Sequence, residues 1–219
     1  MEKQMIKKRI AARVAEEIRD GDVVNLGIGI PTLVPAFLPP DKQVCFHSEN
    51  GILGTGSRPT AEQTESGYIV DAGGSPAIAK SGGSYVDSCT SFGLIRGGHV
   101  DCTVLGALQV DEEGNLANWI IPGKLVPGMG GAMDLVVGAK KIIIAMEHTA
   151  KGVHRILRQC TLPLTAPRCV DLMITNMGVI RVTGQGLKLE EYAAEYTIED
   201  ILDATGARLY TADALRREY

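Results

Sequence analysis

The chain has 219 residues, of which 45% are hydrophobic and 22% charged, so its length and composition predict one globular domain over residues 1–219. A net charge of −4 disfavours nucleic acid and anionic membrane surfaces as partners. The five cysteines are odd in number and have no metal-like pair spacing, so we expect a reducing, cytoplasmic compartment. We expect neither a signal peptide nor a membrane span, because no apolar run has the required length.

Two helices are predicted near the ends of the chain. Apolar residues at every fourth position from Ile6 to Ile18 predict an amphipathic helix over 5–19, which should end at Asp20-Gly21. A second helix is predicted over 197–205, where Thr197 and Asp200 nearly match a capping box.

A strand over 23–28 is predicted to run into the tight turn Gly27-Ile28-Gly29-Ile30-Pro31 and then into a helix over 32–38. A strand, a glycine turn and a helix start in this order present backbone N–H groups to an anion. Thr32 stands where a dinucleotide fingerprint needs its third glycine, which disfavours nicotinamide binding.

Short apolar runs between turn residues predict most of the remaining elements. Strands are expected at 44–48, 68–72, 100–110, 141–146, 170–175 and 178–182, with an extended segment at 118–121. Loops are expected at 73–76, 81–84 and 111–115, and a helical turn at 135–139; the segment 88–95 fits a helix or a strand. Strands that alternate with short helices predict an α/β fold with a largely parallel open sheet.

The stretch Ser48-Glu49-Asn50-Gly51 is the first candidate site, because a carboxylate stands where a strand ends and a turn begins. Asn50 and Gly51 tolerate positive φ, so the chain can turn sharply and leave Glu49 facing a cleft. On spacing alone the stretch also fits a solvated glutamate in a turn.

A second glycine-rich stretch, Gly128-Met129-Gly130-Gly131, suggests what Glu49 could do. A carboxylate is a weak nucleophile, so its target must be an activated carbonyl such as a thioester. The oxyanion that forms needs N–H donors fixed in advance, and glycine backbone can supply them because a ligand can approach it closely. The same stretch also fits a tight turn that leads into the next segment.

Other groupings of reactive side chains have weaker support. Cys45, His47 and Glu49 alternate along a strand, but side chains two apart on one strand rarely face each other for proton transfer. The cluster Glu147-His148 with His154 does not match the H-E-x-x-H zinc motif, and no third metal ligand is evident. We expect caps or turn residues at Asp87, Asp101 and Asp134, and a core or turn role for His99.

Six motifs in order resemble the beta subunit of the 3-oxoacid CoA-transferases, the family I CoA-transferases, over nearly the whole chain. They are Asn25-Leu26-Gly27-Ile28-Gly29-Ile30-Pro31, Ser48-Glu49-Asn50-Gly51, Ile95-Arg96-Gly97-Gly98-His99-Val100-Asp101, Leu116-Ala117-Asn118-Trp119, the stretch from Gly128 to Leu135, and Cys160-Thr161-Leu162-Pro163-Leu164-Thr165. The resemblance implies an open sheet of the CoA-transferase type, related to ribose-phosphate isomerase domains and flanked by helices.

The resemblance also implies roles for individual residues. Glu49 would be the nucleophile of a ping-pong reaction that passes through a glutamyl–CoA thioester, and the N–H of Gly131 would be an oxyanion donor, with Gly130 as the neighbouring choice. Gly27 and Gly29 would line the acyl pocket. Asn50, Gly51 and Met129 are the remaining expected substrate-binding residues. No metal or cofactor is expected, since CoA itself is a substrate.

The expected partners are a separate CoA-transferase alpha subunit, an acyl-CoA and a short-chain carboxylate. Two departures bear on specificity: His47 stands where the family often has a glutamine, and Thr55 and Ser57 flank Gly56 in a loop that is commonly more apolar. Two alternatives keep the fold: a non-catalytic ligand-binding domain and an acyl-CoA hydrolase. The intact Glu49 and both glycine stretches argue against the first, and thiol release without an acceptor acid would reveal the second.

Overall fold

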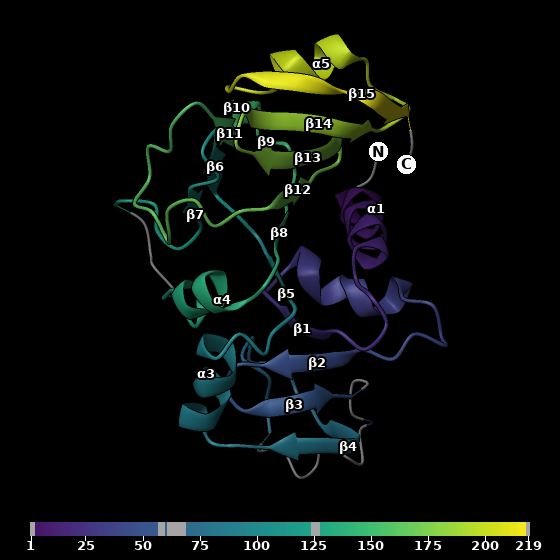
Figure 1. The fold of residues 1–219 in the computed structure, drawn as a ribbon, viewed down its shortest axis with the longest axis vertical. Coiled ribbons are helices and arrows are strands. Elements are labelled where there is room, and N and C mark those ends of the chain that lie inside the picture. Colours follow the sequence, from purple (N-terminus) through teal and green to yellow (C-terminus); the bar gives the residue numbers. More distant parts are fainter. Residues whose placement is uncertain (1–2, 57–59, 61–68, 124–127, 218–219) are drawn as a thin grey trace.

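A ten-stranded sheet runs through the computed structural model, which describes residues 3–56, 60, 69–123 and 128–217. Its strands follow the order β15-β14-β13-β12-β8-β5-β1-β2-β3-β4, from top to bottom in Figure 1. In chain order they are β1 (Val23–Leu26), β2 (Cys45–Ser48), β3 (Ile52–Thr55), β4 (Ala79–Tyr85), β5 (Cys102–Leu105), β8 (Ile142–Ala145), β12 (Leu172–Ile174), β13 (Gly178–Thr183), β14 (Gly186–Tyr192) and β15 (Leu209–Arg217).

Helices cover both faces of this sheet, as predicted for an α/β fold. Helix α1 (Lys3–Glu16) and the 3-10 helix η1 (Ile30–Phe37) pack on one face, while α3 (Ser88–Arg96) and α4 (Ala132–Gly138) pack on the other. Helix α5 (Ile198–Asp203) lies at the β15 end. The described residues also form a three-stranded sheet, β11-β6-β7 (Ile156–Leu157, Gln109–Asp111, Leu116–Ala117), and a two-stranded one, β10-β9 (Val153–His154, Thr149–Ala150).

The prediction of a largely parallel sheet is correct only for its centre. Strands β12, β8, β5, β1 and β2 are parallel neighbours, and β5 and β8 are buried along their whole length, as expected for strands covered on both faces. At one edge β3 and β4 return antiparallel, and at the other β13 and β14 do so, before β15 pairs parallel with β14.

Most predicted boundaries in the first half of the chain shift by a few residues. The predicted helix 5–19 ends at Glu16, although Ile18 is still buried, and the predicted strand 23–28 ends at Leu26. The predicted helix 32–38 is the 3-10 helix η1, with Pro35 inside it. A proline in the interior removes a backbone donor, which favours this short, tight helix over an α-helix.

Three further predictions differ from the structure in type or in extent. The expected loop 81–84 lies within β4, and the expected strand 100–110 is split into β5 and β6 around Gly106. Within the expected strand 68–72, Tyr68 lies outside the described residues, and Val70 makes only an isolated bridge with Pro76. Glycines made 81–84 look like a loop, whereas cross-strand pairing with β3 makes it a strand.

The C-terminal part confirms two local predictions. The strands expected at 170–175 and 178–182 are β12 and β13, which pair antiparallel. Thr197 caps α5, and its side chain and that of Asp200 form a full capping box. The undecided segment 88–95 is helix α3, whose N-cap Asp87 accepts a hydrogen bond from the Thr90 backbone N–H at 2.8 Å.

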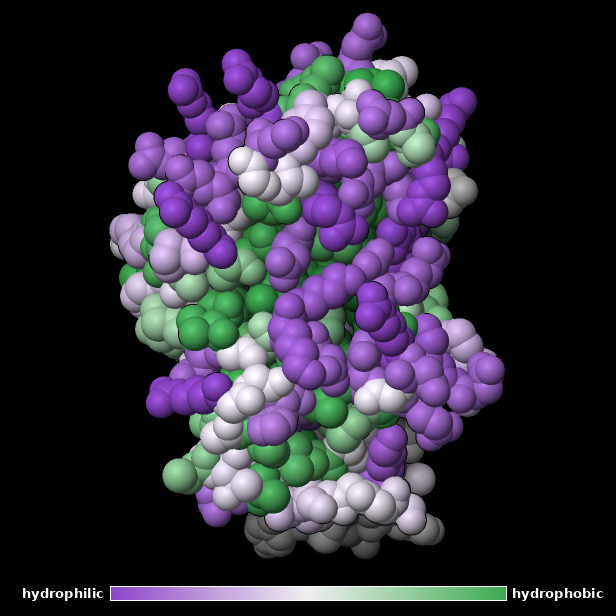
Figure 2. All heavy atoms as spheres, viewed as in Figure 1, coloured by the Kyte–Doolittle hydropathy of each residue, from purple (hydrophilic) through white to green (hydrophobic). Residues whose placement is uncertain are grey.

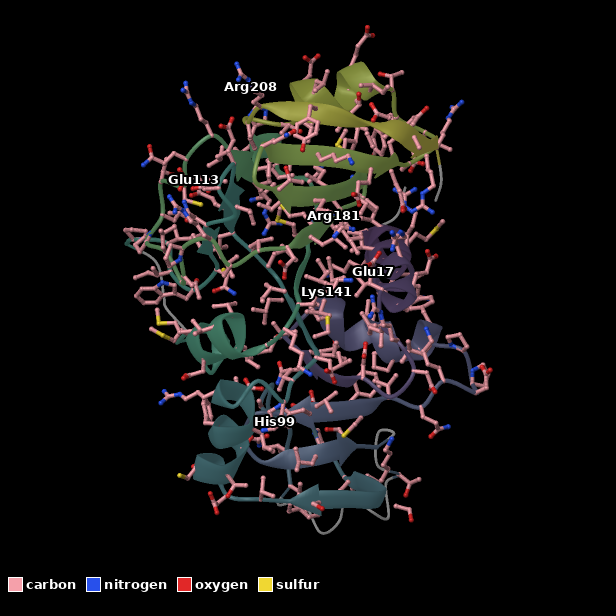
Figure 3. All side chains as sticks on the ribbon, viewed as in Figure 1. Glu17, His99, Glu113, Lys141, Arg181 and Arg208 are labelled. Atoms are coloured by element: carbon pink, nitrogen blue, oxygen red, sulfur yellow. The ribbon has the colours of Figure 1, made fainter. Side chains whose placement is uncertain are left out.

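Buried ion pairs attach α1 to the sheet. Arg13, only 6% exposed, donates two hydrogen bonds to the carboxylate of Glu191 on β14, at 2.7 and 2.8 Å. Glu17 accepts from Lys141 at 2.6 Å and from Arg13 at 2.9 Å; Glu17 and Lys141 lie beside α1 in Figure 3. Burial alone would raise the pKa of Glu17, but its bonds to Lys141 and Arg13 lower that pKa below its usual value. The helix is therefore held by charges as well as by its apolar side.

His148 is fully buried between β8 and α5. Its Nδ1 lies 2.9 Å from the hydroxyl of Thr175, and its Nε2 lies 2.9 Å from that of Thr205. Burial, and to a smaller extent the charge of His154, lowers the pKa of His148 from 6.5 to about 4. The imidazole is therefore neutral in the folded protein at neutral pH.

We predict that His148 makes the folded state less stable as the pH falls. An unfolded chain binds its proton near pH 6.5 and the folded chain only near pH 4, so the stabilisation is full above pH 6.5 and is lost between these values. The loss should be on the order of 3 kcal/mol. Chemical unfolding at a series of pH values should show that the free energy of unfolding changes less with pH in His148→Gln than in the unmodified chain. The exposed His99 offers a control, because the free energy of unfolding of His99→Gln should change with pH as in the unmodified chain. The same change with pH in all three proteins would contradict the prediction.

Candidate active site

Glu49 lies in a turn at the carboxyl end of β2, beside the carboxyl ends of the parallel strands β1 and β5. The turn (residues 49–51) closes when the N–H of Gly51 donates to the Ser48 carbonyl at 2.9 Å. Gly51 has φ 119°, and a Cβ there would lie 2.1 Å from the Val86 carbonyl oxygen. Only glycine fits at this position, so the turn that presents Glu49 depends on it.

The side chain of Asn50 stabilises the same turn through two hydrogen bonds. Its side-chain amide donates to the Val70 carbonyl at 2.7 Å and its Oδ1 accepts from the Ser48 hydroxyl at 2.9 Å. Neither Asn50 nor Gly51 lines the cavities described below, although both were expected to bind substrate. The structure gives both residues contacts that shape the turn.

Glu49 is half-buried in a cleft of about 530 Å³, which we call the main cleft. Its walls are the loop after β1, the loop after β5, and the glycine-rich segment before α4. The lining residues that the argument uses are Asn25, Gly27, Glu49, Asn118, Met129 and Gly130. Three segments that are distant in sequence thus meet at one carboxylate.

The glycine-rich segment, residues 128–131, packs directly against Glu49. A Cβ at Gly131 would lie 3.0 Å from Cγ of Glu49 and 3.2 Å from the ring of Phe92. A Cβ at Gly130, which has φ 55°, would lie 3.9 Å from Oε1 of Glu49. The absence of side chains lets this backbone approach the carboxylate closely. The sequence suggested these residues as oxyanion donors for Glu49 from the chemistry of glycine backbone, and the family resemblance named Gly131 among them.

A buried polar chain lies behind the carboxylate. The Asn25 side-chain amide donates to Oε2 of Glu49 at 3.0 Å and to the His47 carbonyl at 3.2 Å. The imidazole Nε2 of His47 lies 2.8 Å from the Ser91 hydroxyl, and Ser91 is fully buried. Burial lowers the pKa of His47, and the charge of Glu49 raises it in part. His47 is therefore mainly neutral at neutral pH.

A second cavity of about 310 Å³, the side pocket, adjoins the main cleft. The two share Leu26, Ile28, Ala72 and Gly73. Gly29 lines the side pocket, and Gly27 lines the main cleft, where its N–H donates to the Val104 carbonyl at 2.8 Å. Thr55 and Gly56 also line the side pocket, while Ser57 lies outside the described residues.

The competing sites find no support in these contacts. In the grouping of Cys45, His47 and Glu49, the ring nitrogens of His47 lie near Ser91 and Asn25. Elsewhere, burial raises the pKa of Cys102, Cys160 and Cys169 to about 12, so these thiols are poor nucleophiles. Across the described residues, no three His, Cys, Asp or Glu side chains are grouped as metal ligands. His148 is instead bonded to the two threonines described above.

The remaining candidate acids have structural contacts. Asp101 accepts from the Val23 N–H at 2.9 Å and pairs with Lys140 at 2.7 Å, and Asp134 pairs with Arg96. His99 follows α3 and is exposed, so the predicted core role is wrong and the turn role fits.

No helix in the described part of the chain has the length and apolar character to cross a bilayer.

Sequence reasoning did not assign Asn25, Asn118 or Ser91 to the site. Asn118 lines the main cleft, donates to the Gly106 carbonyl at 3.2 Å, and accepts from the Thr165 hydroxyl at 2.6 Å. The available signal was a polar amide within an otherwise apolar strand, as at Asn25 in Val23-Val24-Asn25-Leu26. Such a residue needs a hydrogen-bond partner once buried.

Comparisons with known proteins show the family of this chain. Residues 7–204 match the family model described as Coenzyme A transferase. The chain is 51% identical to acetate CoA-transferase subunit beta of Escherichia coli (strain K12) over 97% of both chains. It is 52% identical to the protein of the same name from Haemophilus influenzae, over 94% of this chain and 92% of that one.

The fold resembles a solved structure of the same class. The acyl-CoA transferase YdiF of E. coli O157:H7, solved as a thioester complex with CoA, superposes with a TM-score of 0.75 and 24% identity. The match covers 97% of this chain but 43% of YdiF, so this chain spans less than half of that protein. The family resemblance drawn from the sequence motifs is thus confirmed, and the chain belongs to the coenzyme A transferase family, where it matches the beta subunits.

Proposed function

We propose that this chain is the beta subunit of an enzyme that moves CoA between a short-chain acyl-CoA and a carboxylic acid, through a glutamyl–CoA thioester on Glu49. The observation that carries the proposal is the position of Glu49: a half-buried carboxylate at the meeting point of two glycine-rich loops, in a cleft of about 530 Å³. A carboxylate so placed can attack a thioester bound in this cleft.

The reaction begins when Oε1 of Glu49 attacks the thioester carbonyl of the acyl-CoA. The tetrahedral oxyanion collapses, the C–S bond breaks, and a mixed anhydride and CoA thiolate form. The thiolate then attacks the Glu49 carbonyl carbon and expels the donor carboxylate, which leaves a glutamyl–CoA thioester. An acceptor carboxylate runs the same steps in reverse and regenerates Glu49. Each step exchanges one activated acyl group for another, so no cofactor is required.

Backbone N–H groups of the glycine-rich segment would stabilise the oxyanion on the substrate carbonyl. Gly131 is the first choice because its backbone packs so closely on Glu49 that an added Cβ would lie 3.0 Å from Cγ. One such donor commonly contributes about 3 kcal/mol to transition-state stabilisation. Met129 and Gly130 line the same wall of the cleft.

The side pocket is the proposed acyl site. Its volume of about 310 Å³ suits a small acyl group, and Gly29, Thr55 and Gly56 line it beside apolar side chains. The chain is about half identical to subunits named for acetate, which supports short-chain acids such as acetate, acetoacetate or butyrate as substrates. The two threonines at this pocket, Thr32 and Thr55, favour an acid with a polar group over a purely aliphatic chain.

A separate CoA-transferase alpha subunit is the proposed protein partner. The relatives matched over their whole length are named as beta subunits, which implies a second kind of subunit. Ile28, shared by both cavities, is 74% exposed, so a large apolar side chain at the cleft entrance is left for a partner to cover. Figure 2 shows a second apolar area over α4, whose Val137 is 79% exposed.

All five cysteines are free thiols, which supports a reducing, cytoplasmic location.

The covalent step predicts a mass change on this chain. The complex of this chain with its alpha subunit, incubated with an acyl-CoA such as acetoacetyl-CoA, should give a CoA adduct that maps to Glu49 and that borohydride reduces. Glu49→Ala should form no adduct and lose transfer activity. The control is Glu199→Gln at an exposed position, which should form the adduct and transfer CoA as the unmodified chain does. A well-folded complex that forms no adduct with a panel of acyl-CoAs would reject the proposal. Thiol release without an acceptor acid would indicate a hydrolase.

The close approach of Gly131 predicts a selective loss of turnover. In Gly131→Ala the new methyl group would meet Cγ of Glu49 at 3.0 Å and displace the carboxylate. A misplacement of about 1 Å can lower a rate by roughly 10²-fold, so kcat should fall by about that factor. Gly93→Ala is the matched control: nothing lies within 4 Å of its new Cβ on α3, so kcat should be unchanged and stability should rise by up to about 1 kcal/mol. Unchanged turnover in Gly131→Ala would remove this glycine from the site.

A further inference from the structure

We infer that Asn25 is a second oxyanion donor, which acts on the glutamyl carbonyl of Glu49 and not on the substrate carbonyl; this rests on the function proposed above. Asn25 is on β1, is 1% exposed, and lines the main cleft. Its Nδ2 lies 3.0 Å from Oε2 of Glu49, which is hydrogen-bond distance for a charge-assisted pair.

The orientation of this amide is determined by its surroundings. Three acceptors surround Nδ2: Oε2 of Glu49 at 3.0 Å, the His47 carbonyl at 3.2 Å, and Nδ1 of His47 at 3.4 Å. Burial lowers the pKa of His47, so its Nδ1 can accept while Nε2 donates to Ser91. The reversed amide would place Oδ1 against a carboxylate and a carbonyl, which repel it. The NH2 group therefore faces Glu49.

The other end of the amide shows that its packing is not optimal for stability. Oδ1 of Asn25 is buried and has no hydrogen-bond partner among the described residues, and a buried carbonyl without a partner destabilises a fold. Strand β1 is otherwise apolar, so a β-branched residue would suit position 25 better. An asparagine whose Nδ2 is well supplied with acceptors while its Oδ1 has no described partner is best explained by what Nδ2 does.

The two oxygens of Glu49 have different neighbours, which separates their roles. Oε1 faces the glycine-rich segment, near Gly130, and Oε2 faces Asn25. If Oε1 attacks the acyl-CoA, it becomes the bridging oxygen of the anhydride, and Oε2 becomes the glutamyl carbonyl oxygen. That oxygen is already within reach of the amide N–H.

The bonds that form and break when the CoA thiolate attacks the anhydride show where the donor acts. The CoA thiolate forms a C–S bond to Cδ of Glu49, and the carbonyl electron pair moves onto Oε2. The intermediate collapses, the Cδ–Oε1 bond breaks, and Oε1 leaves as part of the donor carboxylate. Attack by the acceptor carboxylate on the thioester places charge on Oε2 once more. The Asn25 N–H thus stabilises the oxyanion at both stages, and the glycine-rich segment serves the substrate carbonyl.

Single-turnover kinetics of the complex with the alpha subunit test this assignment. Rapid quenching with acetoacetyl-CoA gives the rate of thioester formation, and addition of acetate gives the rate of its discharge. Asn25→Ala should slow both rates by roughly 10²–10³-fold, with little change in KM for the acyl-CoA. Thr103→Val is the matched control, since Thr103 is the register neighbour of Asn25 on β5, is fully buried, and its hydroxyl has no described partner. It should react at the wild-type rates.

Asn25→Asp provides a readout that a purely structural role would not give. It retains the size of asparagine but replaces the donor by an acceptor, so both rates should fall at neutral pH. They should rise as the pH is lowered and the introduced carboxyl is protonated, because its O–H can then donate to Oε2. Thermal unfolding and binding to the alpha subunit establish that each variant is folded.

The outcomes separate the inference from the proposed function. If the wild-type complex forms the Glu49 adduct and Asn25→Ala forms and discharges it at wild-type rates, the inference is overturned while the function stands. The same follows if the pH profile of Asn25→Asp is parallel to that of the wild type. If the wild-type complex forms no adduct, the function fails and the inference with it.

Discussion

The parallel register of β1, β2 and β5 is the constraint on which the site depends. Asn25 on β1 lies level with His47 on β2 and with Thr103 on β5, so the three strands end at the same edge of the sheet. The turn that carries Glu49 then begins within hydrogen-bond reach of Asn25. A shift of one residue in this register would turn the side chains of β2 to the opposite face and would separate the carboxylate from its neighbours.

Backbone without side chains completes the site. Gly51 allows the turn to close against Val86, and Gly131 allows the segment before α4 to reach Glu49. The site therefore consists of one carboxylate, the side-chain amides of Asn25 and Asn118, and bare backbone, with His47 behind them. Such an arrangement fixes its dipoles before the substrate arrives, so little reorganisation accompanies the reaction.

The sequence was informative where the signal is local. The turn after β2 was predictable because Asn50-Gly51 has a strong turn preference, and the cap of α5 because Thr197 and Asp200 lie three residues apart. The proximity of residues 128–131 to Glu49 is a tertiary contact, which the chemistry of glycine backbone and the family motifs indicated but which no local pattern could specify. Strand β4 was missed because its central glycines are typical of loops, and its pairing with β3 decides otherwise. The role of Asn25 was missed because it depends on the alignment of neighbouring strands.

The ion pair between Arg13 and Glu191 has a consequence for biosynthesis. The two residues are 178 positions apart, so the ribosome completes the partner of α1 long after the helix has emerged. At 5–20 residues per second the delay is roughly 10–35 s. During that time the apolar side of α1 lacks β12, and Arg13 lacks its carboxylate. Nascent chains of this protein therefore have a long interval in which chaperone binding competes with aggregation. A chain truncated before β14 never acquires Glu191, so it stays in this state.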